Sequence, residues 1–455
     1  MNRRLMPYPS LQCVLEYMDA NQRFLLSIHV PSLRKIEKQV SLRIDNLTLS
    51  RFHPTINRID YQLGIHRQYP KGSIPLPYFQ RLNENGGERH DLDQFGRPDP
   101  GPEGILTAGD FFTESPEVGY RTNTESEWRK ITRQNWLRLK KLEVLGVLEK
   151  GQMEEKEMLQ ARVNSNFLAH ANLPLPYTMY LQLTVKDSLK NIQKVERIEY
   201  SKKKPEAVKY LVDKFVGGRK SSVFVKQLKL DRKGDIIRLP LNLRFWVNEL
   251  YITDHVSHIM NCLYPFLDPR SILIQKVSIT GSTQFKLLKN QQHHVVKYAK
   301  TLSLNNLAPE NSWIQIVRDL RNPNVHVDNC KFSSSDFVEI AQRIIRDQLM
   351  IGTRRSFGVY RRHTAKEALW CLGLRIDVKN ETRRHCNPPL TTIVRIPIND
   401  ESDLVISVEN HCEADIRYGI SLGNMEALLI MDVMDRPMQI AVPEVKESEN
   451  LCTIC

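Results

Sequence analysis

The spacing of apolar residues predicts short helices near the start of the chain. Ser10 is a favourable N-cap residue, and the apolar residues after it recur at i, i+3, i+4 and i+7, which is one face of a helix. Asp19 interrupts this pattern, and a second run ends at Pro31 because proline lacks the backbone N–H group. Ser32 precedes a third short run. The pattern therefore predicts a helical module over residues 6–50, which ends in a strand-like stretch at 41–49.

The chain changes character between residues 81 and 124. This stretch is dense in Gly, Pro, Asn and acidic residues, which bury too little apolar surface to stay ordered. We therefore expect a flexible insertion or linker there. Apolar residues return at helical spacings afterwards, with Trp128 and Trp136 among them, and predict a helical segment over residues 125–175.

Residues 176–378 alternate between strand-like and helix-like stretches. Five strand-like stretches each contain a core of two apolar residues separated by one other residue. The first apolar residues of these cores are Leu228, Leu250, Val277, Leu302 and Val325. The steps between them are 22, 27, 25 and 23 residues, which lie within the range of leucine-rich repeats. Only VHVDNCKF carries a cysteine at the ladder position of such repeats. An irregular leucine-rich-repeat-like array and an ordinary α/β sheet both fit this pattern.

Residues 379–445 hold short alternating runs and predict a β-rich C-terminal part, and residues 446–455 are a polar tail. The expected fold class is therefore α+β or α/β. It combines a short N-terminal helical module, a leucine-rich-repeat-like strand–helix array and a β-rich ending.

Composition and charge limit the classes of protein to which this chain can belong. The 455 residues carry a formal net charge of +13, which permits attraction to nucleic acid, acidic proteins or anionic lipid. The start has no apolar stretch typical of a secretory signal, and no stretch reaches the roughly 20 apolar residues that a bilayer needs. The eight cysteines show no framework of spacings. We therefore expect free thiols and an intracellular location, in the cytoplasm or nucleus, away from membranes.

The sequence contains no recognisable motif of catalysis or of metal binding. GGRKSS at 217–222 departs from the phosphate-loop pattern, and Gly217 is better interpreted as the end of a helix over 205–216. His385-Cys386 and His411-Cys412 are adjacent pairs, whereas structural zinc ligands are usually a few residues apart. Cys452 and Cys455 have only the outline of a prenylation box. The sequence therefore predicts no enzyme, no cofactor and no metal site.

One basic stretch, GTRRSFGVYRRH at 352–363, combines arginines with aromatic rings that could contact phosphates and bases. The simpler interpretation is a basic loop after a helix, and Lys202–Lys204 is interpreted as a solvated turn on the same grounds. The residues of this candidate surface for nucleic acid or an acidic partner are Arg354, Arg355, Phe357, Tyr360, Arg361 and Arg362.

YPSLQCVLEYMDANQRFLLSIHVPSLRKIEK resembles the N-terminal segment of a nematode-expanded family of uncharacterised proteins, and that segment is itself similar to a degenerate F-box. LYPFLDPRSILIQKVSI at 263–279 resembles a second hallmark of the same family. The resemblance implies an uncharacterised domain over roughly residues 160–330.

F-boxes dock on the Skp-type adaptor of cullin–RING ubiquitin ligases, while a separate domain selects the target. The F-box resemblance implies adaptor-binding roles for Pro7, Leu11, Val14, Leu15, Met18, Leu25 and Leu26. The segment departs from the F-box pattern in having Met6-Pro7 in place of Leu-Pro, and in lacking a tryptophan near its end.

These observations favour a non-enzymatic protein-interaction protein and, through the F-box resemblance, a substrate-recognition adaptor of a cullin–RING ubiquitin ligase. Two alternatives stay open beside it, a basic nucleic-acid-binding protein and a protein whose N-terminal helices only cover its own core. An unrecognised enzyme is a third. Oligomeric state and target protein are not set by the sequence.

Overall fold

The computed structural model describes residues 8–51, 53–99, 101, 104–113, 123–145, 147–230, 236–253, 256–281, 293–306, 313–375, 393–410 and 426–436. The chain divides into two compact units, residues 1–305 and 306–455. The two His-Cys pairs, the polar tail with Cys452 and Cys455, and Pro7 lie outside the described residues.

The first unit begins with the predicted short helices. They are α1 (Tyr8–Tyr17), α2 (Ala20–His29), the 3-10 turn η1 (Pro31–Leu33) and α3 (Arg34–Gln39). Asp19 separates the first two because its side chain accepts a hydrogen bond from the Asn21 N–H and so caps α2. Helix α1 begins two residues before Ser10, so the prediction of an N-cap at Ser10 is wrong.

Among the described residues of the first unit, strands are hydrogen-bonded in the order β11-β10-β9-β7-β1-β2-β3-β5-β6. Strands β1, β7, β9 and β10 pair in parallel, whereas β1, β2, β3, β5 and β6 pair antiparallel. Their bounds are β1 (Arg43–Leu49), β2 (Thr55–Ile56), β3 (Ile59–Gln68), β5 (Thr178–Lys186), β6 (Ile192–Glu199), β7 (Val223–Leu230), β9 (Phe245–Thr253), β10 (Lys276–Gly281) and β11 (Thr301–Asn306).

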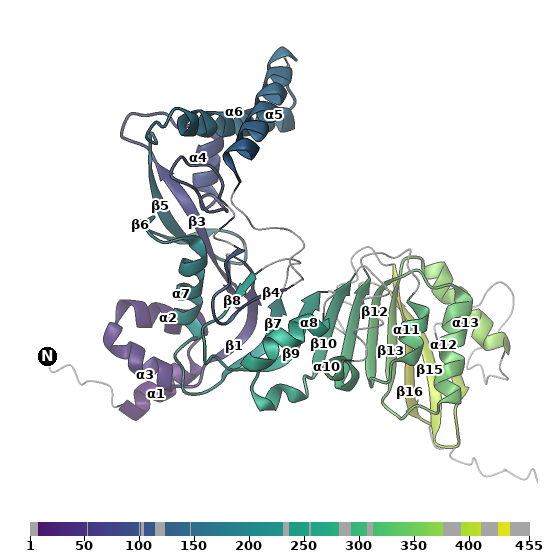
Figure 1. Ribbon diagram of the computed structural model, residues 1–455. Coiled ribbons are helices and arrows are strands. Elements are labelled where there is room, and N and C mark those ends of the chain that lie inside the picture. The colour runs from purple at the N-terminus through teal and green to yellow at the C-terminus, as the bar shows by residue number, and fades with distance from the viewer. Residues whose placement is uncertain are drawn as a thin grey trace, which may run out of the picture. The chain divides into compact units, whose positions relative to one another are not determined.

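The predicted strand cores coincide with the parallel strands. Leu228 of β7 lies opposite Leu250 of β9, which in turn lies opposite Val277 of β10, and all three are fully buried. Helix α7 (Lys204–Val216) precedes β7, and α8 (Val256–Leu263) and α10 (His294–Tyr298) follow β9 and β10. Helix α8 turns four apolar residues inward, which covers one side of the parallel strands (Figure 1). The mixed α/β class is therefore confirmed, while a leucine-rich repeat stays a prediction.

The stretch expected to be a flexible insertion is folded over its described part. It contains the end of helix α4 (Pro77–Glu84) and strand β4 (Asp110–Phe112), which pairs with β8 (Ile236–Arg238). Its loop lies so close to β3 that a Cβ atom on Gly64 would meet the Gly86 carbonyl oxygen at 2.1 Å. Glycine at position 64 is thus required by this close approach.

A buried lysine explains why that loop is ordered. Lys204 has no exposed surface, and its ammonium group donates hydrogen bonds to the carbonyl oxygens of Glu88 and Arg89. Asp91 is buried beside it and accepts from the Lys204 N–H at 3.0 Å and from the Tyr200 hydroxyl. The interpretation of Lys202–Lys204 as a solvated turn is therefore wrong for Lys204, although Lys202 is exposed.

Two long helices, α5 (Glu125–Val144) and α6 (Lys150–His170), follow in the first unit. Thr124 begins α5 through a capping box with Glu127. Leu139, Leu142 and Leu159 form a small core between the two helices. Helical structure after residue 125 thus agrees with the spacing of apolar residues.

The second unit has strands in the order β12-β13-β16-β15-β14, of which β12 and β13 are parallel and the others antiparallel. Phe332, Phe337 and Phe357 form an aromatic cluster in it. The bounds are α11 (Ile314–Asp319), β12 (Asn324–Cys330), α12 (Ser334–Arg346), β13 (Arg354–Val359), α13 (Arg362–Arg375), β14 (Ile393–Pro397), β15 (Ser402–Asn410) and β16 (Ala427–Asp435).

The remaining sequence expectations concern single features. Gly217 ends α7 as predicted, and its N–H donates to the Asp213 carbonyl. Cys13, Cys262 and Cys371 are free thiols. Within the described helices, none is long and apolar enough to cross a membrane. The described residues also contain no group of three or more His, Cys, Asp or Glu side chains arranged to hold a metal ion.

Replacing Lys204 by methionine should lower the free energy of unfolding by about 1–3 kcal/mol, because two buried carbonyl oxygens lose their donor. Urea unfolding of the full chain measures this change. Lys202→Met is the matched control, since that side chain is exposed and should change stability by no more than about 0.5 kcal/mol. Equal stability of the Lys204→Met and wild-type proteins would contradict the assigned role of Lys204.

Candidate interaction surfaces

The N-terminal helices are joined to the rest of the first unit through a buried carboxylate. Glu37 of α3 lies 3.0 Å from Arg23 of α2 and 2.6 Å from Arg219, which follows α7, and all three side chains are almost completely buried. Burial lowers the pKa of both guanidinium groups, and the Glu37 charge opposes that effect. The two arginines also donate to backbone carbonyls, among them those of Val40 and Phe215. The N-terminal helices are therefore fixed to the rest of the first unit.

Further contacts strengthen this junction. The Lys38 ammonium group donates to the Lys214 carbonyl at 2.7 Å, at the C-terminal end of α7, where the helix dipole favours a cation. Burial lowers the pKa of Lys38 to about 8. The ring of Phe24 stacks on that of Phe215, with centroids 4.7 Å apart. Apolar, ionic and capping interactions thus act at the same interface.

The residues expected to bind an adaptor divide between the two sides of these helices. Leu15 is fully buried, and Leu11, Met18, Leu25 and Leu26 are half-buried. Val14 is 43% exposed. Tyr17, which the F-box resemblance does not single out, is 90% exposed and lies one helical turn after Val14. We call the outward side with Val14 and Tyr17 the α1 surface.

The basic stretch at 352–363 is not a loop after a helix, because residues 354–359 form strand β13 between β12 and β16. Arg355 is buried and donates to the carbonyls of Leu320, Asn322 and Pro323, and burial lowers its pKa to about 10. Phe357 is fully buried in the aromatic cluster.

The other residues of the basic stretch are more accessible. Arg354 lies 3.6 Å from Asp432, and the Tyr360 hydroxyl donates to the Asn329 side chain. Arg361 is exposed, and the Arg362 N–H donates to Glu426. The stretch therefore does not present its arginines and rings as one exposed group.

A different combination of rings and cations lies on the parallel strands of the first unit. In β1, β7 and β9, Arg43 lies opposite Phe224, and Phe224 lies opposite Trp246. The Arg43 guanidinium is 5.8 Å from the Phe224 ring, and the Phe224 and Trp246 rings are 5.0 Å apart. Arg270 lies over the other side of the row, 4.4 Å from the Trp246 ring. These are distances at which cation–π and edge-to-face ring interactions occur.

A second row lies farther along the same strands. Lys229 of β7 is opposite Tyr251 of β9, and its ammonium group is 5.1 Å from the Tyr251 ring. Lys276 of β10 approaches the same ring at 5.7 Å. Glu249 accepts hydrogen bonds from Gln227 and from the Tyr251 hydroxyl. Burial and the Glu249 charge raise the pKa of Tyr251 to about 12, so this phenol stays protonated at neutral pH.

We call these two rows the aromatic–cation surface. Its side chains are half-exposed or exposed, whereas Val225, Val247 and Leu250 between them along the strands are buried. Its residues are Arg43, Phe224, Lys229, Trp246, Tyr251, Arg270 and Lys276.

The charge of this surface is mostly positive, but it contains acidic groups as well. Asp268 lies 2.8 Å from Arg270, and hydrogen bonds from Arg270 hold the pKa of this carboxyl below its usual range. Glu249 is the second carboxylate. The surface therefore carries four cations and two anions, and this excess of positive charge favours an acidic partner.

The sequence contains a signal for this surface in the residues that alternate with the apolar cores. The same spacing that places Leu228, Leu250 and Val277 in register also places the residues next to them in register. At these positions, Lys229 lies beside Tyr251, and Phe224 lies beside Trp246.

Residues 203–361 match a protein family described as "Domain of unknown function (DUF3557)". The match covers less than half of the chain, and it includes α7 and the parallel strands β7, β9 and β10. It agrees with the expectation of an uncharacterised family domain, while the F-box and nematode parts of the resemblance stay predictions. No curated protein and no solved structure matches the chain.

Proposed function

We propose that this chain is a non-enzymatic protein-interaction protein and that the aromatic–cation surface binds its partner. The observation that carries the proposal is that three half-exposed rings and four half-exposed or exposed cations lie together on or beside strands whose opposite side chains are buried. Aromatic and arginine side chains are the residues that most often dominate the energy of protein interfaces.

The chemistry of the surface indicates the kind of partner. Trp246 and Tyr251 offer ring faces and edges, and Lys229, Lys276 and Arg43 offer charge around them. A segment with acidic and apolar or aromatic side chains would be complementary in both respects. Because the strands lie in a sheet, the surface is held in one geometry before binding, which lowers the entropic cost of association.

We further propose that the α1 surface attaches the protein to a Skp-type adaptor of a cullin–RING ubiquitin ligase. The F-box resemblance motivates the choice of partner, and exposed Val14 and Tyr17 provide apolar contact area on α1, whose Tyr8 hydroxyl donates to Gln39 of α3. The two surfaces use different residues of the first unit. An adaptor of this kind would hold its target on the strands and the ligase on the helices.

Two other functions have support from particular observations. The burial of Leu15, Arg23 and Phe24 favours helices that cover only their own core. Rings beside cations on an open strand surface also suit the stacking of single-stranded nucleic acid. We favour a protein partner because Glu249 and Asp268 lie among the cations, and a protein segment can place hydrogen-bond donors or basic groups opposite them, whereas a nucleic-acid backbone carries a negative charge at every phosphate.

The double variant Lys229→Glu, Lys276→Glu tests the aromatic–cation surface. Proteins that bind the wild-type chain in affinity capture should bind this variant at least tenfold more weakly, because two attractive charges become repulsive. The control is Lys130→Glu, which changes an exposed lysine on α5 and should leave capture unchanged. Equal capture by the double variant and wild type would contradict the proposal, and salt-sensitive retention on single-stranded nucleic acid alone would favour the nucleic-acid alternative.

The variants Val14→Asp and Tyr17→Asp test the α1 surface. Pull-down with a purified Skp-type adaptor should recover the wild-type chain and at most a tenth as much of either variant, since each places a charge in an apolar contact. Val147→Asp is the matched control, because Val147 is 93% exposed and lies between α5 and α6. No recovery of the wild type, or equal recovery of all four proteins, would leave the helices with a structural role only.

A further inference from the structure

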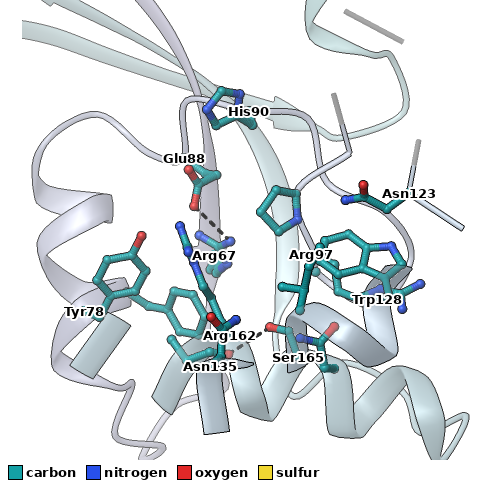
Figure 2. A pocket seen from close by; sticks show the side chains of 16 residues that line it. Arg67, Tyr78, Glu88, His90, Arg97, Asn123, Trp128, Asn135, Arg162 and Ser165 are labelled. Atoms are coloured by element: carbon teal, nitrogen blue, oxygen red, sulfur yellow. Dashed lines mark hydrogen bonds and ion pairs between the residues drawn. The ribbon is translucent and has the colours of Figure 1, made fainter. Parts of the chain in front are cut away.

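A cavity of about 240 Å³ lies in the first unit, away from both surfaces described above. It is formed by β3, α4, the loop after α4, and the long helices α5 and α6. Figure 2 shows Arg67 near its centre, between Tyr78 on one side and Trp128 on the other, with Glu88 above it and Asn135 and Ser165 below. Its chemistry does not depend on the proposed function.

Arg67 is the central polar group of the cavity. It projects from β3 and is only 2% exposed. Its Nη2 atom lies 3.3 Å from Glu88, its Nε atom donates to the Tyr177 hydroxyl at 3.4 Å, and its guanidinium group lies 4.3 Å from the centre of the Phe79 ring. Its Nη1 atom is buried and has no hydrogen-bond partner among the described residues.

Two more buried polar atoms without described hydrogen-bond partners line the same cavity. They are the Nδ2 atom of Asn135 on α5 and the Oδ1 atom of Asn166 on α6. Leaving such groups unpaired costs about 1–3 kcal/mol each, and more when the group is charged. Three of them around one cavity indicate that a polar ligand completes their hydrogen bonds.

Three arginines line the cavity, and two of them have acidic partners. Among the described residues, Arg67 forms an ion pair with Glu88, with 3.3 Å between the nitrogen and oxygen atoms. Arg97 is paired with Asp93 at 2.7 Å and with Glu125 at 3.6 Å, and its guanidinium group lies over the Trp128 ring. Arg162 of α6 is exposed at the edge. The arginines therefore outnumber the acidic side chain that lines the cavity.

We infer that this cavity binds a small molecule that carries an oxyanion, either a carboxylate or a phosphate. The oxyanion accepts from Nη1 of Arg67 and Nδ2 of Asn135, while Asn166 contributes the acceptor for a hydroxyl or amine of the same ligand. Arginine is suited to this role because its planar group donates to carboxylate and phosphate oxygens in a fixed geometry. Phe79 and Trp128 form apolar walls, so the rest of the ligand is small and has a ring or a short carbon chain.

The size of the cavity narrows the class of ligand. Drug-sized ligands occupy pockets of about 300–1,000 Å³, so a nucleotide is too large for this one. A benzoate-sized carboxylate or a short phosphate monoester fits. Glu88 is the counter-ion of Arg67, but it leaves Nη1 without an acceptor, and a hydrogen bond from that atom to an oxyanion is stronger than one to water.

Calorimetric titration of the full-length protein tests the inference with two probes, benzoate and inorganic phosphate. At least one should bind saturably, and the preferred probe distinguishes a carboxylate from a phosphate ligand. Asn135→Leu should weaken that binding at least tenfold because it removes one donor and narrows the cavity. Arg67→Met should abolish it, but loss of the Glu88 pair can also destabilise the fold, so Asn135→Leu is the deciding variant.

Arg133→Ala is the matched control, because Arg133 is exposed on α5 two residues from Asn135 and does not line this cavity. Its affinity for the bound probe should equal that of the wild type. Binding by neither probe would overturn the inference, as would equal affinity of the wild type and Asn135→Leu. A tenfold loss in Arg133→Ala as well would indicate non-specific attraction to basic α5 and would also overturn it.

Discussion

Glu37 accepts hydrogen bonds from Arg23 and Arg219 in a place that water hardly reaches, and the position of the N-terminal helices depends on that arrangement. Arg23 belongs to α2, Glu37 to α3, and Arg219 to the turn between α7 and β7. One carboxylate does not balance two guanidinium groups by itself. Backbone carbonyls at the ends of α3 and α7 supply the remaining negative potential. Removing one partner of such a buried group typically costs about 3–5 kcal/mol.

This junction has consequences for both interaction surfaces. Leu15 and Phe24 face inward on the helices beside it, and Val14 and Tyr17 lie on the outer side of α1. Arg23 of the junction also donates to the Ser41 carbonyl just before β1, whose Arg43 is the first residue of the aromatic–cation surface. The helices and the parallel strands of the first unit thus form one scaffold. A partner on either surface would meet side chains whose positions are set before it arrives.

Local patterns in the sequence were sufficient for part of this structure. The short helices follow from 3.6-residue spacing and from Asp19 and Pro31, which act on their immediate neighbours. The in-register cores Leu228, Leu250 and Val277 follow from repeated spacing of buried residues. What local patterns omit is contact between distant residues. Lys204 and Asp91 are 113 positions apart, and their hydrogen bond orders a loop whose composition indicates flexibility.

The candidate sites were harder to predict for the same reason. Arg219 looked like part of a failed phosphate loop, and its partner Glu37 lies 182 positions earlier. Arg355 looked like an exposed basic residue, but in β13 its side chain is buried and donates hydrogen bonds to backbone carbonyls of its own unit. The cavity around Arg67 unites a strand, a loop and three helices, and none of them carries a recognisable motif. Pairing of strands, rather than any single stretch, created the aromatic–cation surface.

Hydrogen exchange of the full-length protein tests most directly whether the N-terminal helices are part of the core. The amides of α2 and α3 should exchange as slowly as those of α7 and β1, because the Glu37 junction opens only when the first unit unfolds. Exchange of α2 and α3 that is at least a hundredfold faster than exchange of α7 and β1 would contradict this account. The helices would then be an independently mobile module.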